Sequence, residues 1–136
     1  MVDSSVLREI VLCSRLESLN EIESLTLELR EQFDLSVEQE ANILVVLSEA
    51  VSNAIVHGNR LNPDRKVTVQ YWYEDGKLMF RISDEGQGFD PSTLADPTAP
   101  QNLLKPTGRG IFLMRRLADA VDFSDGGRTV TLTFRL

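Results

Sequence analysis

The chain has 136 residues, with 14 basic and 21 acidic side chains and a formal net charge of −7. Its length suits one domain, and 42% hydrophobic with 26% charged residues is typical of a soluble globular protein. The acidic balance excludes a generic binder of nucleic acid or of an anionic membrane, because such binders carry a basic surface. We expect a cytoplasmic protein, since the longest apolar run, Ile43 to Leu47, cannot span a membrane and the N-terminus does not resemble a signal peptide.

The first half of the chain predicts one strand followed by two helices. A strand is expected over 8–14, and apolar residues recurring every three or four positions predict a helix over 16–33. Ser36 begins a second helix, and Gln39 three positions later completes a capping-box pattern. Gly58 marks the end of this helix. The apolar stripe of the second helix comprises Val37, Leu44, Leu47, Val51 and Ile55.

The second half predicts two hairpins separated by a long loop and a helix. Alternating apolar residues over 67–73 and 78–82 flank a two-residue turn signal, which predicts the first hairpin. Residues 84–110 hold four glycines and four of the five prolines, which indicates a functional loop. A helix is expected over 110–119 and a final hairpin over 121–134. This order predicts an α+β fold, a two-layer sandwich of a mixed, mainly antiparallel sheet with helices on one face.

Three polar residues lie at intervals of four on the second predicted helix: Glu49, Asn53 and His57. Positions i, i+4 and i+8 share one gradually rotating helix face. A carboxylate beside a carboxamide oxygen can address a hydrated divalent cation and an attacking hydroxyl. Taken alone, the same pattern also fits a solvated polar face opposite the apolar stripe.

A second motif, Asp84-x-Gly86-x-Gly88, follows the third predicted strand. The glycines permit positive φ angles or a close approach of the backbone to a ligand. Asp84 would lie at the end of the strand, where its carboxylate could accept a hydrogen bond from an exocyclic amine. An ordinary glycine turn remains open, whereas an EF-hand calcium loop is a poor fit because its later acidic ligands are missing.

A third motif, Thr107 to Gly110, opens the helix expected over 110–119. Glycines at a helix N-terminus leave backbone N–H groups free to bind an anion, and Lys105 and Arg109 add positive charge there. The spacing fits neither a Walker loop nor a dinucleotide fingerprint. A glycine-flanked helix cap remains the alternative for this motif alone.

In order and spacing, the three motifs resemble the nucleotide-binding motifs of the GHKL (histidine-kinase-like) ATPase and kinase superfamily. Within it, the segments 49–59 and 108–114 look most like those of the anti-sigma factor serine kinases. The resemblance extends from about Leu7 to Phe134. It implies the GHKL, or Bergerat, ATP-binding fold, with a single domain over 1–136 and an ATP lid at about 90–109.

The resemblance implies a role for each motif residue. Asn53 would coordinate Mg²⁺ on the ATP phosphates, and Glu49 would be the general base for a serine hydroxyl of a partner protein. Asp84 would accept a hydrogen bond from the adenine amino group. The remaining expected nucleotide contacts are Gly86 and Gly88 near the base, Gly108 and Gly110 at the phosphates, and Thr129 near the adenine.

Two further residue roles complete these expectations. Arg109, with Lys105 beside it, is inferred as a phosphate contact from its charge and position in the third motif. His57 is expected to be structural and to close the second helix.

The resemblance also implies partners: a sigma factor, and a STAS-type anti-anti-sigma protein that is phosphorylated on serine. A homodimer is expected, with no direct contact to nucleic acid or membrane. A sensor histidine kinase is disfavoured because the one histidine already belongs to the nucleotide motif, and ATPases with large transducer domains would need more than 136 residues. A nucleotide-regulated binding module without kinase turnover, or a partner-switching regulator without a sigma factor, remains open.

Overall fold

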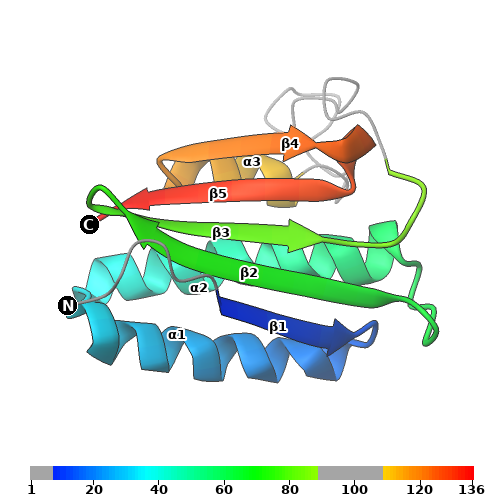
Figure 1. Cartoon of the computed structure of the whole chain (residues 1–136), viewed down its shortest axis with the longest axis horizontal. Coiled ribbons are helices and arrows are strands. Elements are labelled where there is room, and N and C mark those ends of the chain that lie inside the picture. The colour runs from blue at the N-terminus through cyan, green and yellow to red at the C-terminus, as the bar shows by residue number, and fades with distance from the viewer. Residues whose placement is uncertain (1–7, 89–108) are drawn as a thin grey trace.

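The computed structural model describes residues 8–88 and 109–136, which form five strands and three α-helices (Figure 1). Short 3₁₀-helical turns lie at Leu16–Ser18 and Asp125–Gly127, and a π-helical turn lies at Ala54–Gly58. The main elements, in chain order, are β1 (Arg8–Cys13), α1 (Leu19–Phe33), α2 (Val37–Asn53), β2 (Lys66–Glu74), β3 (Lys77–Ser83), α3 (Arg109–Leu117), β4 (Ala120–Ser124) and β5 (Thr129–Arg135).

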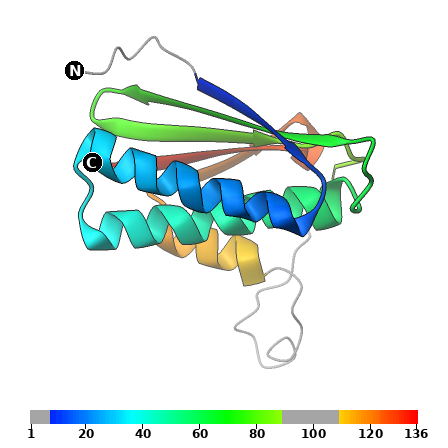
Figure 2. The same cartoon turned by 90° about the horizontal axis from the view of Figure 1, so that it is seen from below.

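The strands form one sheet in the order β1-β2-β3-β5-β4, and the helices lie on one of its faces (Figure 2). The expected two-layer α+β sandwich is thereby confirmed. Every pair of neighbouring strands is antiparallel within the part of the chain that the structure describes. The expectation of a mixed sheet is therefore wrong for that part of the chain. The pairs β2–β3 and β4–β5 are hairpins, and β1 and β5 pair antiparallel with β2 and β3, so no parallel pair forms there.

The core fills the space between the inner face of the sheet and the helices. Alternation along each strand places its apolar residues on this inner face. Phe80 of β3 is fully buried, and its ring meets Phe134 of β5 edge-on with centroids 5.8 Å apart. All three helices contribute buried side chains to this core, among them Ile22, Leu29, Ile43, Leu47 and Met114.

Helix α2 lies against the sheet in this core. Its start carries the expected capping box, in which the Gln39 N–H donates to the Ser36 hydroxyl and the Ser36 N–H donates to the Gln39 side chain. The assignment of Val37 to the apolar stripe is wrong: its exposed fraction is 81%, because it occupies the first helical position at the outer end of α2. The continuous helical stretch Val37–Gly58 has the length and composition of a membrane span, but Ile43 and Val51 in it are fully buried within the domain.

Helix α2 ends in a π-helical turn, Ala54–Gly58. In this turn the Asn59 N–H donates to the Ala54 carbonyl at 2.8 Å, and the Leu61 N–H donates to the Ile55 carbonyl at 2.8 Å. Such wide turns are often found at functional sites. The turn brings Gly58 and Asn59 beneath the segment that follows β3.

Candidate functional site

Asp84 directly follows β3 and lies between the sheet and the end of α2. Its backbone N–H donates to the Arg128 carbonyl at 2.9 Å, which extends the β3–β5 pairing by one residue. Its carboxylate accepts from the Gly86 N–H at 2.8 Å. Burial raises the pKa of the Asp84 carboxyl above its ordinary value, more than the Gly86 N–H and the Arg128 guanidinium lower it.

Glycines allow the segment after β3 to lie directly on the end of α2. A Cβ at Gly58 would lie 2.5 Å from the Asp84 carboxylate, and one at Gly86 would collide with the Gly58 carbonyl. Gly88 has a φ of 80°, and a Cβ there would collide with the Gly126 carbonyl. These glycines are therefore required by close backbone packing, with Asp84 held beside Gly58.

Glu49 and Asn53 are half-buried on α2, and the first turn of α3 lies against them. A Cβ at Gly110 would lie 2.5 Å from a Glu49 carboxylate oxygen and 3.5 Å from the Asn53 amide nitrogen. The first and third sequence motifs therefore meet in space. His57, in the π-helical turn, is exposed.

A pocket opens where these elements meet, between the helix layer and the sheet. Its walls combine apolar surface with the polar side chains of Asn53, Asp84 and Arg128. Mostly apolar walls with a few convergent polar groups are typical of a site for a small organic ligand. The remaining lining residues are Ala50, Ala54, Gly58, Ile82, Met114, Phe123, Gly127 and Val130.

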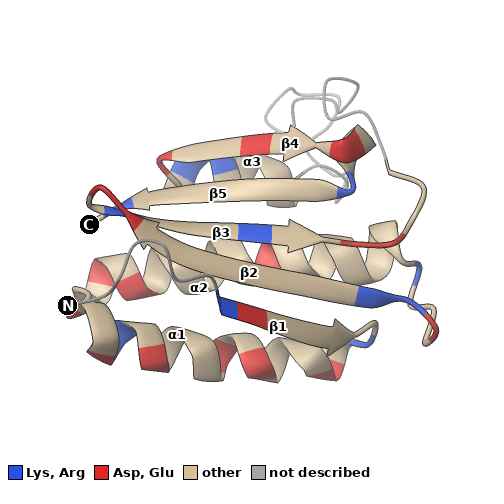
Figure 3. Ribbon diagram, viewed as in Figure 1, with Lys and Arg blue, Asp and Glu red and all other residues tan. Residues whose placement is uncertain are grey.

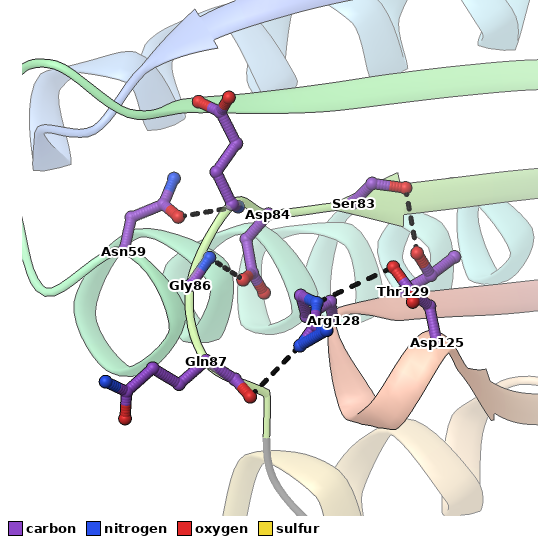
Figure 4. A network of polar contacts seen from close by, with 9 residues as sticks. Asn59, Ser83, Asp84, Gly86, Gln87, Asp125, Arg128 and Thr129 are labelled. Atoms are coloured by element: carbon purple, nitrogen blue, oxygen red, sulfur yellow. Dashed lines mark hydrogen bonds and ion pairs between the residues drawn. The ribbon is translucent and has the colours of Figure 1, made fainter.

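Arg128, which directly precedes β5, lines this pocket (Figure 4). The register pairs Ile82 with Val130 and Ser83 with Thr129, so Thr129 lies on the opposite face of the sheet from Val130. The Thr129 and Ser83 hydroxyls share a hydrogen bond of 3.1 Å there. Thr129 is not among the residues that line the pocket, and its contact with adenine stays a prediction.

Arg128 is not among the site residues predicted from the sequence. A signal for it existed, because Val130, Leu132 and Phe134 alternate toward the core and Arg128 continues that series by two residues.

Asn59 was also missed, and it joins three segments near the pocket. Its side chain is fully buried. The carbonyl oxygen accepts from the Glu85 N–H at 2.8 Å, and the amide donates to the Ser14 hydroxyl at 2.9 Å and to the Lys66 carbonyl at 3.0 Å. Asn59 thus fixes the residue after Asp84 to the ends of β1 and β2, and periodicity gave no signal for it.

Some predicted residues lie outside the part of the chain that the structure describes. These are Lys105, Gly108 and the lid residues 90–108; Arg109 begins α3, but its side chain is not among those described. Within 8–88 and 109–136, no group of three or more His, Cys, Asp or Glu side chains could hold a metal ion.

Comparisons with known proteins agree with this geometry. The model of the family "Histidine kinase-like ATPase domain" matches residues 12–134. The serine-protein kinase RsbW of Listeria monocytogenes serovar 1/2a is 30% identical over 105 residues, covering 72% of this chain and 67% of the relative. The anti-sigma F factor of Bacillus subtilis strain 168 is 33% identical over 112 residues, covering 77% of this chain and 75% of the relative.

A solved structure shares the fold. A crystal structure of the RsbU and RsbW domains of a Mycobacterium tuberculosis protein matches with a TM-score of 0.65 and 17% identity. The match covers 97% of this chain but only 32% of the other. The resemblance to the GHKL superfamily is confirmed by the family match, and the chain belongs to the histidine kinase-like ATPase domain family.

Proposed function

We propose that the chain is an ATP-dependent protein serine kinase that also acts as an anti-sigma factor. The observation that carries this proposal is the pocket between the two layers, which Asn53 and Asp84 line. Gly110 lies close to Asn53 and to the Glu49 carboxylate beside that pocket. The names of the relatives, serine-protein kinase and anti-sigma F factor, give the same direction.

The lining of the pocket supports ATP as the proposed substrate. The adenine would lie between the apolar walls formed by residues such as Ile82 and Met114, with its amino group donating to Asp84. Gly86 and Gly88 let the neighbouring backbone approach the base. Gly110 in the first turn of α3, and Gly108 two positions earlier in the sequence, would offer backbone N–H groups to the phosphates.

Asn53 fits a magnesium site that is completed by the nucleotide. Mg²⁺ is usually held by one or two protein ligands together with phosphate oxygens and waters, so a cluster of protein carboxylates is not needed. The Asn53 side chain reaches the pocket from α2 and offers one amide oxygen. The metal would neutralise phosphate charge in a domain whose formal charge is −7.

Glu49 is the proposed general base. The γ-phosphoryl group would pass from ATP to the oxygen of the acceptor serine while Glu49 takes the hydroxyl proton, and ADP would leave. Phosphoryl transfer depends mainly on positioning and electrostatics, so a carboxylate of ordinary basicity suffices. The packing of Gly110 against the Glu49 carboxylate would hold it in place. Arg109 and Lys105 are proposed to assist at the phosphates.

The proposed partners are a sigma factor and a STAS-type anti-anti-sigma protein, which this kinase would phosphorylate on serine. Nucleotide state and partner choice would then be coupled, and that coupling must be reciprocal. We further propose a cytoplasmic homodimer that makes no direct contact with nucleic acid. The acidic residues along α1 support the last point (Figure 3), because phosphate groups would be repelled there.

The test is transfer of label from γ-labelled Mg-ATP to purified STAS proteins from the same genome. Wild-type protein should give acid-stable phosphoserine, and Glu49→Gln should abolish it while ATP binding persists. Glu38→Gln is the matched control, because Glu38 lies exposed in the first turn of the same helix. ATP binding without transfer to any STAS protein would favour the nucleotide-regulated binding module instead, and absence of ATP binding would overturn the assignment.

A further inference from the structure

The guanidinium of Arg128 lies at the edge of the pocket, beside Asp84. One terminal nitrogen donates to the Gln87 carbonyl at 3.1 Å, and Nε lies 3.7 Å from the Asp125 carboxylate (Figure 4). The same terminal nitrogen lies 3.3 Å from the place where a Cβ at Gly88 would be, so the glycine leaves room for it. These contacts fix the guanidinium at the pocket while its side chain remains 36% exposed.

Arg128 retains hydrogen-bonding capacity toward the pocket. A guanidinium carries five N–H donors in a rigid plane, and the contacts to Gln87 and Asp125 use only some of them. Asp84 and Arg128 are cross-strand neighbours, joined by the backbone hydrogen bond between them, and both line the pocket. An anionic acceptor and a cationic donor therefore stand side by side at one edge of the cavity.

This pair matches one edge of adenine. The Watson–Crick edge of adenine places the N6 amino donor next to the N1 acceptor, whereas guanine places the O6 acceptor next to the N1–H donor. We propose that Arg128 is a base-specificity residue, whose guanidinium donates to adenine N1 while Asp84 accepts from the N6 amino group. This inference rests on the proposed function, since it names how the same pocket reads ATP.

The arrangement also rejects the wrong base. Guanine placed the same way would set its O6 against the Asp84 carboxylate, and both groups are acceptors. Discrimination would therefore come from repulsion as well as from a matched pair. The positive charge of Arg128 further lowers the pKa of Asp84 against the effect of burial, which favours the ionised acceptor.

The test compares ATP with 1-deaza-ATP, in which a C–H group replaces N1 and the shape is kept. Dissociation constants are measured calorimetrically with the full chain, its Arg128→Ala variant and the control Arg81→Ala. Arg81 is exposed and lies over the Trp72 ring at 5.0 Å, remote from the pocket residues. Wild type and Arg81→Ala should bind ATP about tenfold or more tightly than 1-deaza-ATP, the range for a hydrogen bond to a charged group. In Arg128→Ala this ratio should fall to about one.

The outcomes separate the inference from the function on which it rests. Failure of the wild type to bind ATP would overturn the proposed function. If Arg128→Ala binds ATP with an unchanged ratio of the two dissociation constants, only the role of Arg128 is overturned. Tighter ATP binding by that variant would also overturn this role, because the guanidinium would then obstruct the pocket. If Arg128→Ala does not fold, Arg128→Gln takes its place. A folded Arg128→Gln that still binds ATP should show a lower ratio than the wild type, and an unchanged ratio would overturn the role of Arg128.

Discussion

Replacement of Asn59 by alanine should destabilise the domain by an amount that the structure allows us to work out. The Asn59 amide is fully buried and makes three hydrogen bonds, to the Glu85 N–H, the Ser14 hydroxyl and the Lys66 carbonyl. Alanine removes all three of these hydrogen bonds at once. The change leaves the backbone path of the π-helical turn untouched, so it reports on the side chain alone.

The magnitude follows from which groups are left without a partner. The Ser14 hydroxyl keeps its bond to the Arg65 carbonyl, so it remains satisfied. The Glu85 N–H and the Lys66 carbonyl lose part-buried hydrogen bonds to Asn59, so each loss costs about 1 kcal/mol, at the low end of the range for an unsatisfied group. The space left by the fully buried Asn59 side chain adds to this cost. We expect a loss of about 3 kcal/mol in the free energy of unfolding, a large part of the roughly 5–15 kcal/mol typical of a domain.

The measurement is urea unfolding followed by far-ultraviolet circular dichroism at neutral pH. Asn20→Ala is the matched control, because Asn20 is exposed on α1 and its loss should change the free energy of unfolding by less than about 0.5 kcal/mol. A loss below about 1 kcal/mol in Asn59→Ala, with an unchanged denaturant slope, would refute the reasoning. It would mean that water or a shift of the chain satisfies both groups freely.

Three further changes have defined outcomes. Asp84→Asn should raise the stability of the domain at about pH 7. Burial raises the pKa of Asp84 in the folded state, so the wild type loses stability as the pH rises from 3.8 through that raised pKa. The gain in melting temperature of the variant over the wild type should vanish below about pH 3.8, and a gain independent of pH would contradict burial of Asp84 as the cause. Gly110→Ala should slow phosphoryl transfer at least about tenfold, because its Cβ would displace the Glu49 carboxylate, and an unchanged rate in the labelled-ATP assay would contradict this. Ser36→Ala removes the cap of α2 and should cost about 1 kcal/mol in urea unfolding; a change below about 0.3 kcal/mol would contradict it.

Local patterns were sufficient to predict most of the fold. Alternation identified the strands, and the capping box at Ser36 and Gln39 located the start of α2. The stripe was wrong only at Val37, since periodicity gives the direction of a side chain but not whether a neighbouring layer reaches it. The motifs around Glu49 and Asp84 also lie close together as expected, although their roles stay predictions.

The rest depended on contacts between distant segments. Intervals of four predict that His57 continues the face of Asn53, but the π-helical turn changes the rotation per residue after Asn53. The strand register decides that Arg128 lines the pocket and that Thr129 contacts Ser83. Such pairings join residues more than forty positions apart, and no short pattern in the sequence specifies them.

The pocket lies on the boundary between the two layers, with Asn53 and Ala54 on the helix side and Asp84 and Val130 on the sheet side. A ligand bound there would contact both layers and would stabilise the packing of the helices against the sheet. A free ligand concentration of about a hundred times the dissociation constant would add about 2.7 kcal/mol to the free energy of unfolding. The melting temperature of this domain would then rise with the concentration of nucleotide in solution.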